Sequence, residues 1–515
     1  MLYCANVRRR EPTQHVTHGA VAAGHPQTAA AGIEILRQGG NAFDAAIAAL
    51  LAACVAEATL TSLGGAGFLL AHTATGESVL FDFFSQTPGE RRSEREVHFY
   101  PVAVDFGDAV QEFHIGPGSM AVPGTVAGVF HIHGRLGRLP MAKVAAPAIE
   151  LARRGLEIDP FQSFCRGILE PILLATPGAR ALFVPQGHLQ KPGEPWAAPE
   201  LADTLDWLVA EGPDVFYRGE IAHRLVADSE RLGGHLTAKD LRTYRVIERE
   251  PLRWPYRDRS LLTNPAPSAG GTLICFALQL LSHFDIGTLR FGTAAHLELL
   301  TEVMRLTDEA RRADFKRQDN TFLSPVVLDR YGSRLRRHWG STTHISVLDA
   351  EGNAASVTST NGEGSAYVIP GTGIMINNML GEEDLHPEGF DQWPVGRRIA
   401  SMMAPSIVLR DGEPEIVLGS GGSKRIRTAL LQVLANLIDF QMPLAQAIAS
   451  PRIHWENHIL HLEPDLQPPL HLEDSSAVLW REQNFYFGGV HTVRRTGQGL
   501  EAEGDHRRSG TALLL

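Results

Sequence analysis

The chain has 515 residues, of which 44% are hydrophobic and 20% are charged, with 50 glycines and 31 prolines. This composition is typical of a globular protein and excludes fibrous and disordered classes. The formal net charge is −11 at pH 7, and the 47 basic residues are scattered without a long Lys/Arg run. The basic footprint of a nucleic-acid-binding protein is missing, so nucleic acid is not an expected partner.

Cysteine spacing and apolar stretches narrow the class of protein further. The four cysteines lie far apart without a CxxC pair, so neither a zinc site nor a disulfide framework is predicted. Residues 1–17 carry three arginines followed by polar residues, where a secretory signal would have an apolar core; as written, the sequence predicts a cytoplasmic protein. The longest apolar stretch, Ala45 to Ala56, is too short to span a bilayer, so we expect a buried helix and no membrane partner.

Helices and a glycine cluster open the chain. Residues 27–38 have apolar side chains at helical spacing and stop at a glycine pair, which is a common signal for a helix end. Asn41 can cap the next helix, residues 42–58, whose apolar residues on most faces predict burial. The glycine-rich residues 62–68 then predict a turn that feeds strands, including residues 79–84.

The middle of the chain is predicted to be mostly scaffold. Residues 142–154 have a helical pattern in a region interrupted by prolines and glycines, and no group of candidate catalytic or binding residues is recognisable there. Residues 264–271 predict a rigid turn before a helix at 273–282, and a second helix is expected at 294–314.

From Thr343 onward the pattern becomes that of strands. Residues 343–360 alternate around a Gly/Asn-containing turn and predict a β-hairpin. Strands at 406–410 and 415–418 and a helix at 427–440 follow. Strands flanked by buried helices in both halves predict a layered arrangement of helices and sheets, although periodicity does not say which layers stack.

The strongest chemical signal is Ser341-Thr342-Thr343-His344, at the start of that hairpin. Cleavage of the bond before Thr342 would free an α-amino group, which titrates near neutrality and can accept the proton of the threonine hydroxyl. The tetrapeptide alone is a weak signal, because threonine is common at strand starts.

Longer motifs make the signal specific. The run STTHISVLDAEGNAASVTST, followed by GTGIMINN, resembles the start of the small subunit of gamma-glutamyltransferases, whose precursors cut themselves before the first Thr of a TTH triplet. Further matches lie, in order, at residues 39–46, 63–68, 122–128 and 267–271. The chain is therefore identified as a member of this family of N-terminal-nucleophile hydrolases. The resemblance implies an α+β fold, a four-layer αββα sandwich, in which residues 1–341 (the large-subunit part) and 342–515 (the small-subunit part) are intertwined in one domain.

The family's catalytic residues can be carried over individually. The nucleophile falls on Thr342, and the threonine that orients it falls on Thr360. The oxyanion donors are backbone N–H groups of a glycine-rich turn, here residues 419–423, and we assign them to Gly421 and Gly422. Because the family's proline before the paired glycines is absent, Gly422 and Ser423 remain the alternative pair.

Substrate-binding residues match in part. Ser401 is retained from a serine pair that holds the substrate's α-carboxylate, but its partner is replaced by Met402. The carboxylate that binds the substrate's α-amino group falls on Glu382 or Glu383, and Asn361 completes the predicted substrate-binding set.

The main departure from the family lies at Phe84, which replaces an arginine that clamps the γ-glutamyl α-carboxylate. A phenyl ring offers neither charge nor a bidentate fork for that group. Arg397, Arg398 or Lys424 are the alternative cations. Only residues 385–400 separate the acidic cluster from Ser401, shorter than the lid segment of many members, which favours a more open site.

The resemblance implies an autoprocessed threonine-nucleophile amide hydrolase or transferase that cleaves γ-glutamyl amides such as glutathione through an acyl-Thr342 intermediate. Water or an amine would be the acceptor, no metal or organic cofactor is needed, and the mature protein would be a heterodimer of the two self-cleaved fragments. Two alternatives stay open: an acylase with a non-glutamyl specificity, favoured by Phe84, and an unprocessed, inactive ligand-binding relative. Many relatives are exported, so a start codon further upstream would imply a periplasmic or secreted protein.

Three histidines are weaker candidates for metal binding or catalysis. His131 and His133 have strand spacing for two metal ligands on one face, but no third ligand motif accompanies them, so an ordinary histidine pair is expected. His344 is expected to be structural. The sequence contains neither a P-loop nor a GxSxG elbow.

Overall fold

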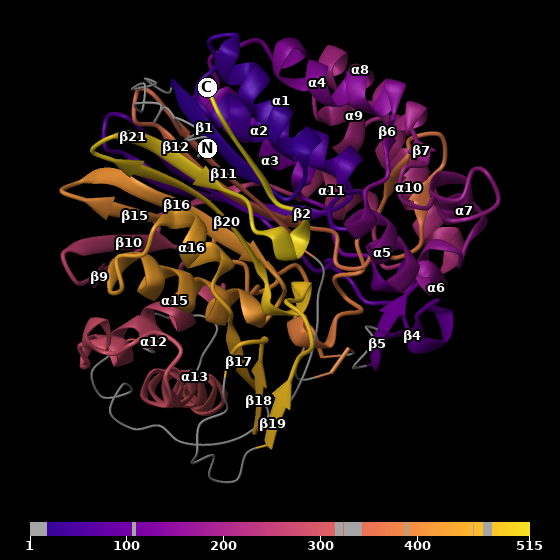
Figure 1. Ribbon diagram of the computed structural model, residues 1–515. Coiled ribbons are helices and arrows are strands. Elements are labelled where there is room, and N and C mark those ends of the chain that lie inside the picture. Colours follow the sequence, from indigo (N-terminus) through magenta and orange to yellow (C-terminus); the bar gives the residue numbers. More distant parts are fainter. Residues whose placement is uncertain are drawn as a thin grey trace, which may run out of the picture.

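The computed structural model describes residues 18–105, 110–314, 323, 342–386, 389–390, 392–456, 458–466 and 476–515. Helices and strands are mixed along the whole chain, as predicted, and the strands gather in the middle with helices on either side (Figure 1). Strands that come before and after Thr342 contribute to the same sheets.

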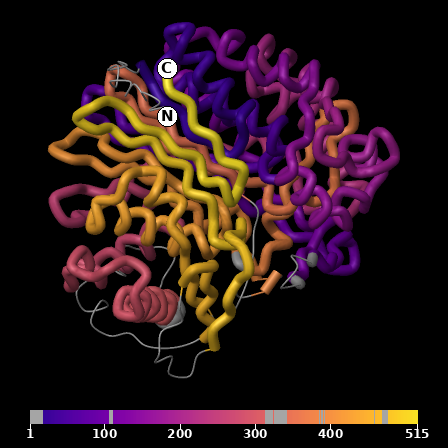
Figure 2. The backbone as a smooth tube through the Cα atoms, in the orientation of Figure 1, coloured from indigo at the N-terminus to yellow at the C-terminus, as the bar shows by residue number. Residues whose placement is uncertain are grey.

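The first sheet has seven antiparallel strands in the order β22-β1-β11-β12-β2-β3-β8. The predicted hairpin forms its centre, as β11 and β12. The carboxyl-terminal strand, yellow in Figure 2, lies beside the indigo amino-terminal strand, and the N–H of Leu515 donates to the carbonyl of Gly19 over 2.9 Å. The strands are β1 (Gly19–Ala23), β2 (Ala66–His72), β3 (Ser78–Phe83), β8 (Ile247–Arg249), β11 (Thr343–Asp349), β12 (Ala354–Thr360) and β22 (Thr511–Leu514).

The second sheet has six antiparallel strands in the order β21-β20-β16-β15-β10-β9. Its strand β16 packs against β11 and β12 of the first sheet, so the two sheets face each other. The strands are β9 (Leu252–Tyr256), β10 (Arg259–Thr263), β15 (Ser406–Arg410), β16 (Glu413–Gly421), β20 (Gly489–Thr496) and β21 (Gly499–Glu503).

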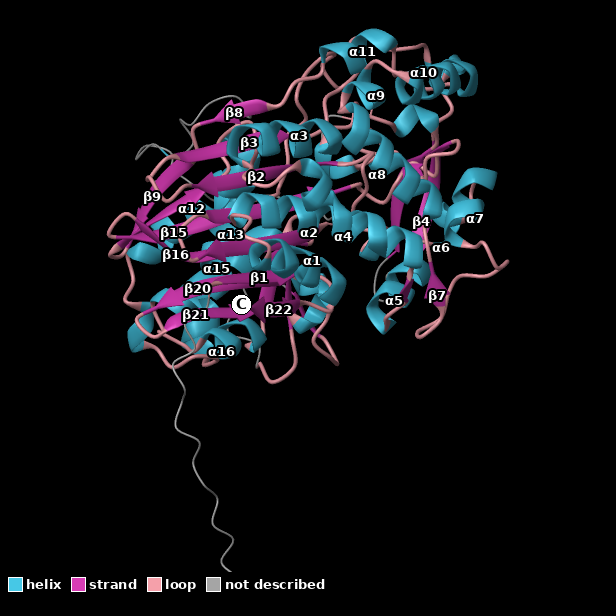
Figure 3. Cartoon of the chain, turned by 90° about the horizontal axis from the view of Figure 1, so that it is seen from above, coloured by secondary structure: helices cyan, strands magenta, loops and turns pink. Residues whose placement is uncertain are grey.

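Helices cover the outer faces of both sheets. Helix α2 packs on β11 and β12, and α15 packs on β16. Viewed from above, α1, α2 and α3 lie over the strands (Figure 3). On the first sheet lie α1 (Pro26–Arg37), α2 (Ala42–Ala56) and α3 (Thr125–Leu136), while α4 (Met141–Arg154) packs on α2 and α8 (Pro199–Glu211) packs on α4. On the second sheet lie α12 (Gly270–Ser282), α15 (Arg425–Ile438) and α16 (Leu444–Ala449), while α13 (Ala294–Asp314) packs on α12.

Smaller elements surround this framework. The helices are α5 (Pro160–Ile168), α6 (Glu170–Leu173), α7 (Pro177–Phe183), α9 (Asp214–Tyr217), α10 (Glu220–Leu232) and α11 (Ala238–Thr243). The strands are β4 (Tyr100–Asp105), β5 (Val110–Ile115), β6 (Leu156–Glu157), β7 (Pro195–Trp196), β13 (Val368–Ile369), β14 (Ile374–Met375), β17 (Ile453–Glu456), β18 (Ile459–Leu462) and β19 (Ser476–Leu479).

Alternation along the central strands divides the apolar core in two. Phe68 of β2 and Leu348 of β11 belong to the cluster between the sheets, whereas their neighbours Leu69 and Val347 belong to the cluster under α1, α2 and α4. Because strand side chains alternate in direction, residues of one parity face the second sheet and those of the other parity face the helices. This alternation decides which way Thr342 and Thr343 point.

Helix α2 forms where Asn41 predicted its start. The Asn41 side chain accepts from the N–H of Asp44 over 2.9 Å, and the Asp44 carboxylate accepts from the N–H of Asn41 over 3.2 Å. This reciprocal capping box fixes the helix entry. All fifteen residues of the helix are buried, as its apolar composition predicted. Within the described residues, no helix is both long and apolar enough to cross a membrane.

Three local expectations were wrong. Residues 419–421, read as a turn, are the last residues of β16, because they pair with residues 489–491 of β20. Helix α12 begins at Gly270 instead of Leu273, where the N–H groups of Ala269 and Gly270 both donate to the carbonyl of Ser401. The segment containing His131 and His133 is helix α3 and not a strand, so the two side chains do not share one face.

Candidate active site

The hairpin register places the two candidate catalytic threonines opposite each other. Thr343 pairs with Ser359 and His344 with Thr358, so the same antiparallel register carried one step further sets Thr342 against Thr360. Directly opposed residues project from the same face of a sheet. Both threonines are buried, at 5% and 6% exposure. Residues that lie eighteen positions apart in the sequence thus become neighbours at the open end of the hairpin.

The face on which Thr342 lies is the one between the sheets. His344 and Ser346, which share its parity, both point at the second sheet: the Ser346 hydroxyl donates to the carbonyl of His491 over 3.0 Å. The His344 ring packs on β16, where a Cβ on Gly419 would lie 2.2 Å from it. The Thr342 side chain therefore belongs to the layer between the sheets.

His344 has the structural role expected of it. Its Nδ1 lies 2.8 Å from the Thr358 hydroxyl and its Nε2 lies 3.0 Å from the Ser346 hydroxyl. Burial, together with the nearby His491, holds the pKa of His344 well below its ordinary value. A neutral imidazole with both nitrogens engaged joins β11 to β12 and is not a free base beside Thr342.

Buried histidines predict acid sensitivity of the fold. Burial lowers the pKa of His454 and of His491 to about 4, whereas the unfolded chain titrates near 6.5. Each neutral buried histidine therefore contributes its full stabilisation above about pH 6.5. As the pH falls toward the pKa of the folded state, the free energy of unfolding decreases, by on the order of 2 kcal/mol per histidine at pH 5. We expect Tm to fall between pH 7.5 and 5, and His454→Gln to flatten that slope. A Tm independent of pH over this range would contradict the prediction.

A glycine turn overlies Thr342. A Cβ on Gly421, the last residue of β16, would lie 2.1 Å from the Thr342 carbonyl oxygen. The chain then turns through Gly422 (φ +119°) and Ser423 (φ +49°) into α15. Glycine permits both the close approach and the positive φ, and a helix amino terminus adds partial positive charge. This close approach places Gly421 beside the candidate nucleophile. Which N–H groups of the turn serve as oxyanion donors is a matter for proposal.

Thr343 points to the opposite side, toward the helices. Its hydroxyl donates to Oε2 of Glu57 over 2.5 Å, and the Thr28 hydroxyl donates to Oε1 over 2.7 Å. Glu57 is fully buried at the end of α2, and burial raises the pKa of its carboxyl group. A Cβ on Gly24 would lie 2.4 Å from Oε2, so glycine is needed there to admit the carboxylate.

Two of the predicted substrate-binding residues, Asn361 and Glu382, lie just beyond Thr360. Asn361 is buried, and its Oδ1 accepts from the Ser62 hydroxyl over 3.3 Å. Glu382 is 8% exposed, and its Oε1 would lie 2.4 Å from a Cβ on Gly362. Glu383 is exposed and raises the pKa of His114 in opposition to the dominant effect of burial. Burial beside Gly362 thus favours Glu382 over Glu383 as the residue that faces the site.

Ser401 lies at a different turn. Its carbonyl accepts from the N–H of Ala269 and from the Ser268 hydroxyl, each over 2.8 Å, and its own hydroxyl accepts from the N–H of Met403 over 3.1 Å. These bonds join the predicted 264–271 turn to residues 401–403, which precede β15 in the chain. Within the described part of the chain, no hydrogen bond joins Ser401 to Thr342, so the substrate role of Ser401 rests on the resemblance.

Phe84, at the position of the family's carboxylate-binding arginine, is a core residue. It is 1% exposed and stacks on Phe68 with ring centroids 5.3 Å apart. Two of the three alternative cations have internal partners: Arg398 lies 3.4 Å from Asp82, and Lys424 lies 3.1 Å from Glu456. The third, Arg397, is exposed.

Arg508 is a site residue that the sequence analysis missed. Its Nη1 donates to the Thr342 carbonyl over 3.1 Å, and its Nη2 donates to the Phe485 carbonyl over 3.3 Å. The side chain is 4% exposed. The available signal was a pair of arginines, Arg507 and Arg508, between Asp505 and a glycine near the end of the chain, which resembles a surface charge cluster when read alone.

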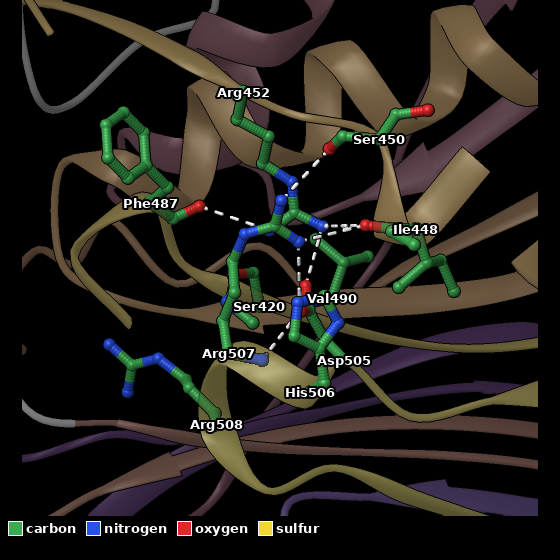
Figure 4. Close-up of polar contacts among 12 residues, drawn as sticks. Ser420, Ile448, Ser450, Arg452, Phe487, Val490, Asp505, His506, Arg507 and Arg508 are labelled. Carbon is green, nitrogen blue, oxygen red and sulfur yellow. Dashed lines mark hydrogen bonds and ion pairs between the residues drawn. The ribbon is translucent and has the colours of Figure 1, made fainter. Parts of the chain in front are cut away.

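A buried ion network supports this segment. Asp505 lies 2.6 Å from Nη2 of Arg452 and 3.2 Å from Nη1 of Arg507, and Arg507 also lies 2.5 Å from Glu463. These charges hold the pKa of Asp505 well below its ordinary value against the opposing effect of burial. In Figure 4, Arg452, Asp505 and Arg507 converge, whereas Arg508 points away from them.

The described part of the chain contains no group of three or more His, Cys, Asp or Glu residues placed to hold a metal. His131 lies 2.8 Å from Glu248, and His133 lies 2.7 Å from the carbonyl of Leu139. Cys54, Cys165 and Cys275 are free and buried.

Comparisons with known proteins show the family to which the chain is similar. The family model described as gamma-glutamyltranspeptidase matches residues 28–515. The acylase ACY 1 proenzyme of Pseudomonas sp. (strain SE83) is 34% identical over 471 residues, covering 87% of this chain and 84% of the relative. The glutathione hydrolase proenzyme of Pseudomonas aeruginosa is 31% identical over 543 residues, covering 96% of this chain and 94% of the relative.

Solved structures show the same fold. A cephalosporin acylase from Bacillus halodurans has a TM-score of 0.82 at 23% identity, covering 100% of this chain and 99% of that one. The gamma-glutamyltranspeptidase of Helicobacter pylori has a TM-score of 0.53 at 26% identity, covering 62% of this chain and 92% of that one.

Proposed function

Because the chain belongs to the gamma-glutamyltranspeptidase family, we propose that Thr342 is the nucleophile both of self-cleavage and of amide hydrolysis or transfer. The observation that carries the proposal is the placement of Thr342 opposite Thr360 and beneath the glycine turn at Gly421. A hydroxyl nucleophile, an orienting hydroxyl and backbone donors are the parts that acyl transfer requires.

Self-cleavage would produce the catalytic base, which is the α-amino group of Thr342. The Thr342 hydroxyl attacks the carbonyl of residue 341, the C–N bond breaks, and the acyl group moves from the Thr342 nitrogen to its oxygen. Water then hydrolyses this ester, which leaves a carboxylate on residue 341 and a free α-amino group on Thr342. That amine titrates near neutrality, so it can accept the hydroxyl proton in every later turnover.

The mature reaction repeats the attack on a substrate amide. The Thr342 oxygen adds to the substrate carbonyl, the α-amine passes the hydroxyl proton to the leaving nitrogen, and an acyl-Thr342 ester remains. Water or an acceptor amine resolves this ester and restores the hydroxyl. Backbone N–H groups of Gly421 and Gly422 are proposed to stabilise the oxyanion, at roughly 2.7–4 kcal/mol per donor.

The arrangement of layers supports the expected four-layer αββα sandwich, with helices outside two facing sheets. We also propose that residues 1–341 and 342–515 remain together after cleavage as two chains of one domain. The interleaved order β22-β1-β11-β12-β2 in the first sheet supports this assembly, because strands of the two parts alternate there.

The first candidate substrates are γ-glutamyl amides such as glutathione, on which the P. aeruginosa relative acts by its name. In this reading Glu382 binds the substrate ammonium, with Asn361 and Ser401 beside it. The α-carboxylate must then be held without the family's arginine, because Phe84 is buried in stacking with Phe68.

A second candidate is an acylase for side chains other than γ-glutamyl, and Phe84 favours it. An apolar side chain removes the cation that selects an α-carboxylate, and relatives named acylases share the family and the fold. Loss of a bidentate Arg–carboxylate contact typically weakens recognition by at least about tenfold.

Competing anilides separate the two candidates. If the acylase candidate holds, kcat/KM for aliphatic acyl anilides should exceed that for γ-glutamyl anilide by at least tenfold, because Arg398 and Lys424 are already ion-paired and an aliphatic acyl group needs no cation. Phe84→Arg should narrow that ratio, provided Tm shows that the core tolerates the change. A clear preference of the parent enzyme for γ-glutamyl anilide would retain the glutathione-type assignment instead.

A further inference from the structure

Thr342 needs an anchor that the sheet does not provide. The hydrogen-bonded ladder between β11 and β12 begins at Thr343, so Thr342 is the first residue outside it. Self-cleavage would then remove the covalent bond on its other side. A chain terminus without such ties frays, and misplacing a nucleophile by about 1 Å lowers the rate by roughly 10²-fold.

Arg508 supplies a contact at that residue. The N–H group at its Nη1 donates to the Thr342 carbonyl, which stays in the chain after cleavage. We propose that Arg508 and Glu57 clamp the Thr342-Thr343 dipeptide and position the new amino terminus for catalysis. This inference rests on the proposed function of Thr342.

The burial of Arg508 is unusual. Among the described residues, no carboxylate forms an ion pair with it and its Nε has no hydrogen-bond partner, although the side chain is 4% exposed. Burying a guanidinium without a directly paired carboxylate is costly, and Arg508 has two backbone carbonyls and the Phe485 ring, with its centroid 5.6 Å away, as its contacts. Burial lowers the pKa of Arg508 only to about 10, so it remains a cation at neutral pH.

The surrounding backbone forms a slot for this side chain. A Cβ on Gly421 would lie 3.0 Å from Nη1, one on Gly422 would lie 3.3 Å from Nη2, and one on Gly489 would lie 2.5 Å from Cδ. Behind the slot, the ion pairs of Asp505 with Arg452 and Arg507 fix the segment that carries Arg508 (Figure 4). The guanidinium is therefore held rigidly beside the candidate oxyanion turn.

Glu57 completes the clamp from the helix side. Its carboxylate accepts a hydrogen bond from the Thr343 hydroxyl, while Arg508 donates one to the Thr342 carbonyl, so successive residues are held by opposite charges. The charge of Glu57 also acts on Arg508 and counters the effect of burial on the Arg508 pKa. Such paired restraint from two sides orients the Thr342 hydroxyl more firmly than either contact alone.

Charge gives the clamp a second effect. A cation near the Thr342 α-amino group disfavours the ammonium form and keeps the amine available as a base. The other ionisable groups that act on Arg508 are Cys165 of α5, Arg425 of α15, Asp505 and Glu57. Loss of the Arg508 charge is expected to raise the pKa of the α-amine, so the acidic limb of the kcat profile moves to higher pH.

Arg508→Met tests the proposal. This variant keeps the length of the side chain but removes its charge and donors, and we expect self-cleavage and kcat to fall by 10- to 100-fold with KM changed less than threefold. Arg508→Lys, which retains the charge and one donor, should recover part of kcat, and Glu57→Gln should slow self-cleavage. Rates are measured by intact mass and by hydrolysis of an acyl anilide across pH 5 to 9, with activity expressed per cleaved molecule.

Arg166→Met is the matched control. Arg166 is also buried, burial also lowers its pKa to about 10, and its contacts are with Gln190 and the ring of Trp196. The control should keep the parental rates and pH profile even if Tm falls. The clamp is overturned if Arg508→Met works at the parental rate, if both Met variants lose activity in proportion to Tm, or if folded Arg508→Lys recovers nothing. A parent chain that never cleaves overturns the proposed function itself.

Discussion

Thr342→Ala is expected to remain a single uncut chain under conditions in which the parent protein separates into residues 1–341 and 342–515. The substitution removes the oxygen that attacks the preceding carbonyl, and uncleaved protein never gains the α-amine. Removal of a nucleophile of this kind lowers kcat by about 10⁴- to 10⁶-fold. Intact mass and a denaturing gel measure cleavage, and anilide hydrolysis measures turnover.

Amino-terminal sequencing of the small fragment provides the check on position. The parent fragment should begin Thr-Thr-His, because Thr342 precedes Thr343 and His344. Cleavage that persists in Thr342→Ala would assign the nucleophile elsewhere. A parent chain that stays uncut and inactive would instead support the ligand-binding relative.

Gly421→Ala should also slow both reactions, although it alters no side chain that reacts. The added Cβ would lie 2.1 Å from the Thr342 carbonyl oxygen, and this neighbour is backbone that cannot rotate away. Either Thr342 or the turn must shift, which we expect to slow self-cleavage and kcat by about 10²-fold or more. Both rates are followed by intact mass and anilide hydrolysis.

Gly134→Ala serves as the comparison for this substitution. Gly134 lies within α3, and a Cβ there would meet nothing within 4 Å. Replacing a helical glycine by alanine should leave activity unchanged and stabilise the protein by roughly 0.5–1 kcal/mol. Parental self-cleavage in Gly421→Ala would show that the turn does not govern the placement of Thr342.

Much of the fold could be predicted because local signals agreed with tertiary packing. Asn41 and Asp44 together cap α2, and the alternation of residues 343–360 formed the central hairpin. The proximity of Thr342 and Thr360 could be inferred from the family motif. The hairpin register gives the physical reason, because the two residues lie equally far from the turn on opposite strands.

The failures have tertiary causes. Gly419 and Gly421 belong to a strand because β20 pairs with them and the His344 ring fills the space that side chains would occupy. His131 and His133 suit a strand or a helix equally well until packing decides. Arg508 could not be recognised because its importance comes from a contact with Thr342 across 166 positions, and no local pattern encodes such a contact.

The meeting of β22 with β1 has a consequence for how this protein could be encoded. The carbonyl of Leu515 accepts from the N–H of His18, and the N–H of Leu515 donates to Gly19, so both ends of the described chain lie at one edge of the first sheet. A circular permutant that joins Leu515 to His18 and opens between residues 341 and 342 would be translated as an initiator methionine followed by Thr342. Removal of that methionine would then expose the reactive amine, so the enzyme would no longer need to cut its own chain.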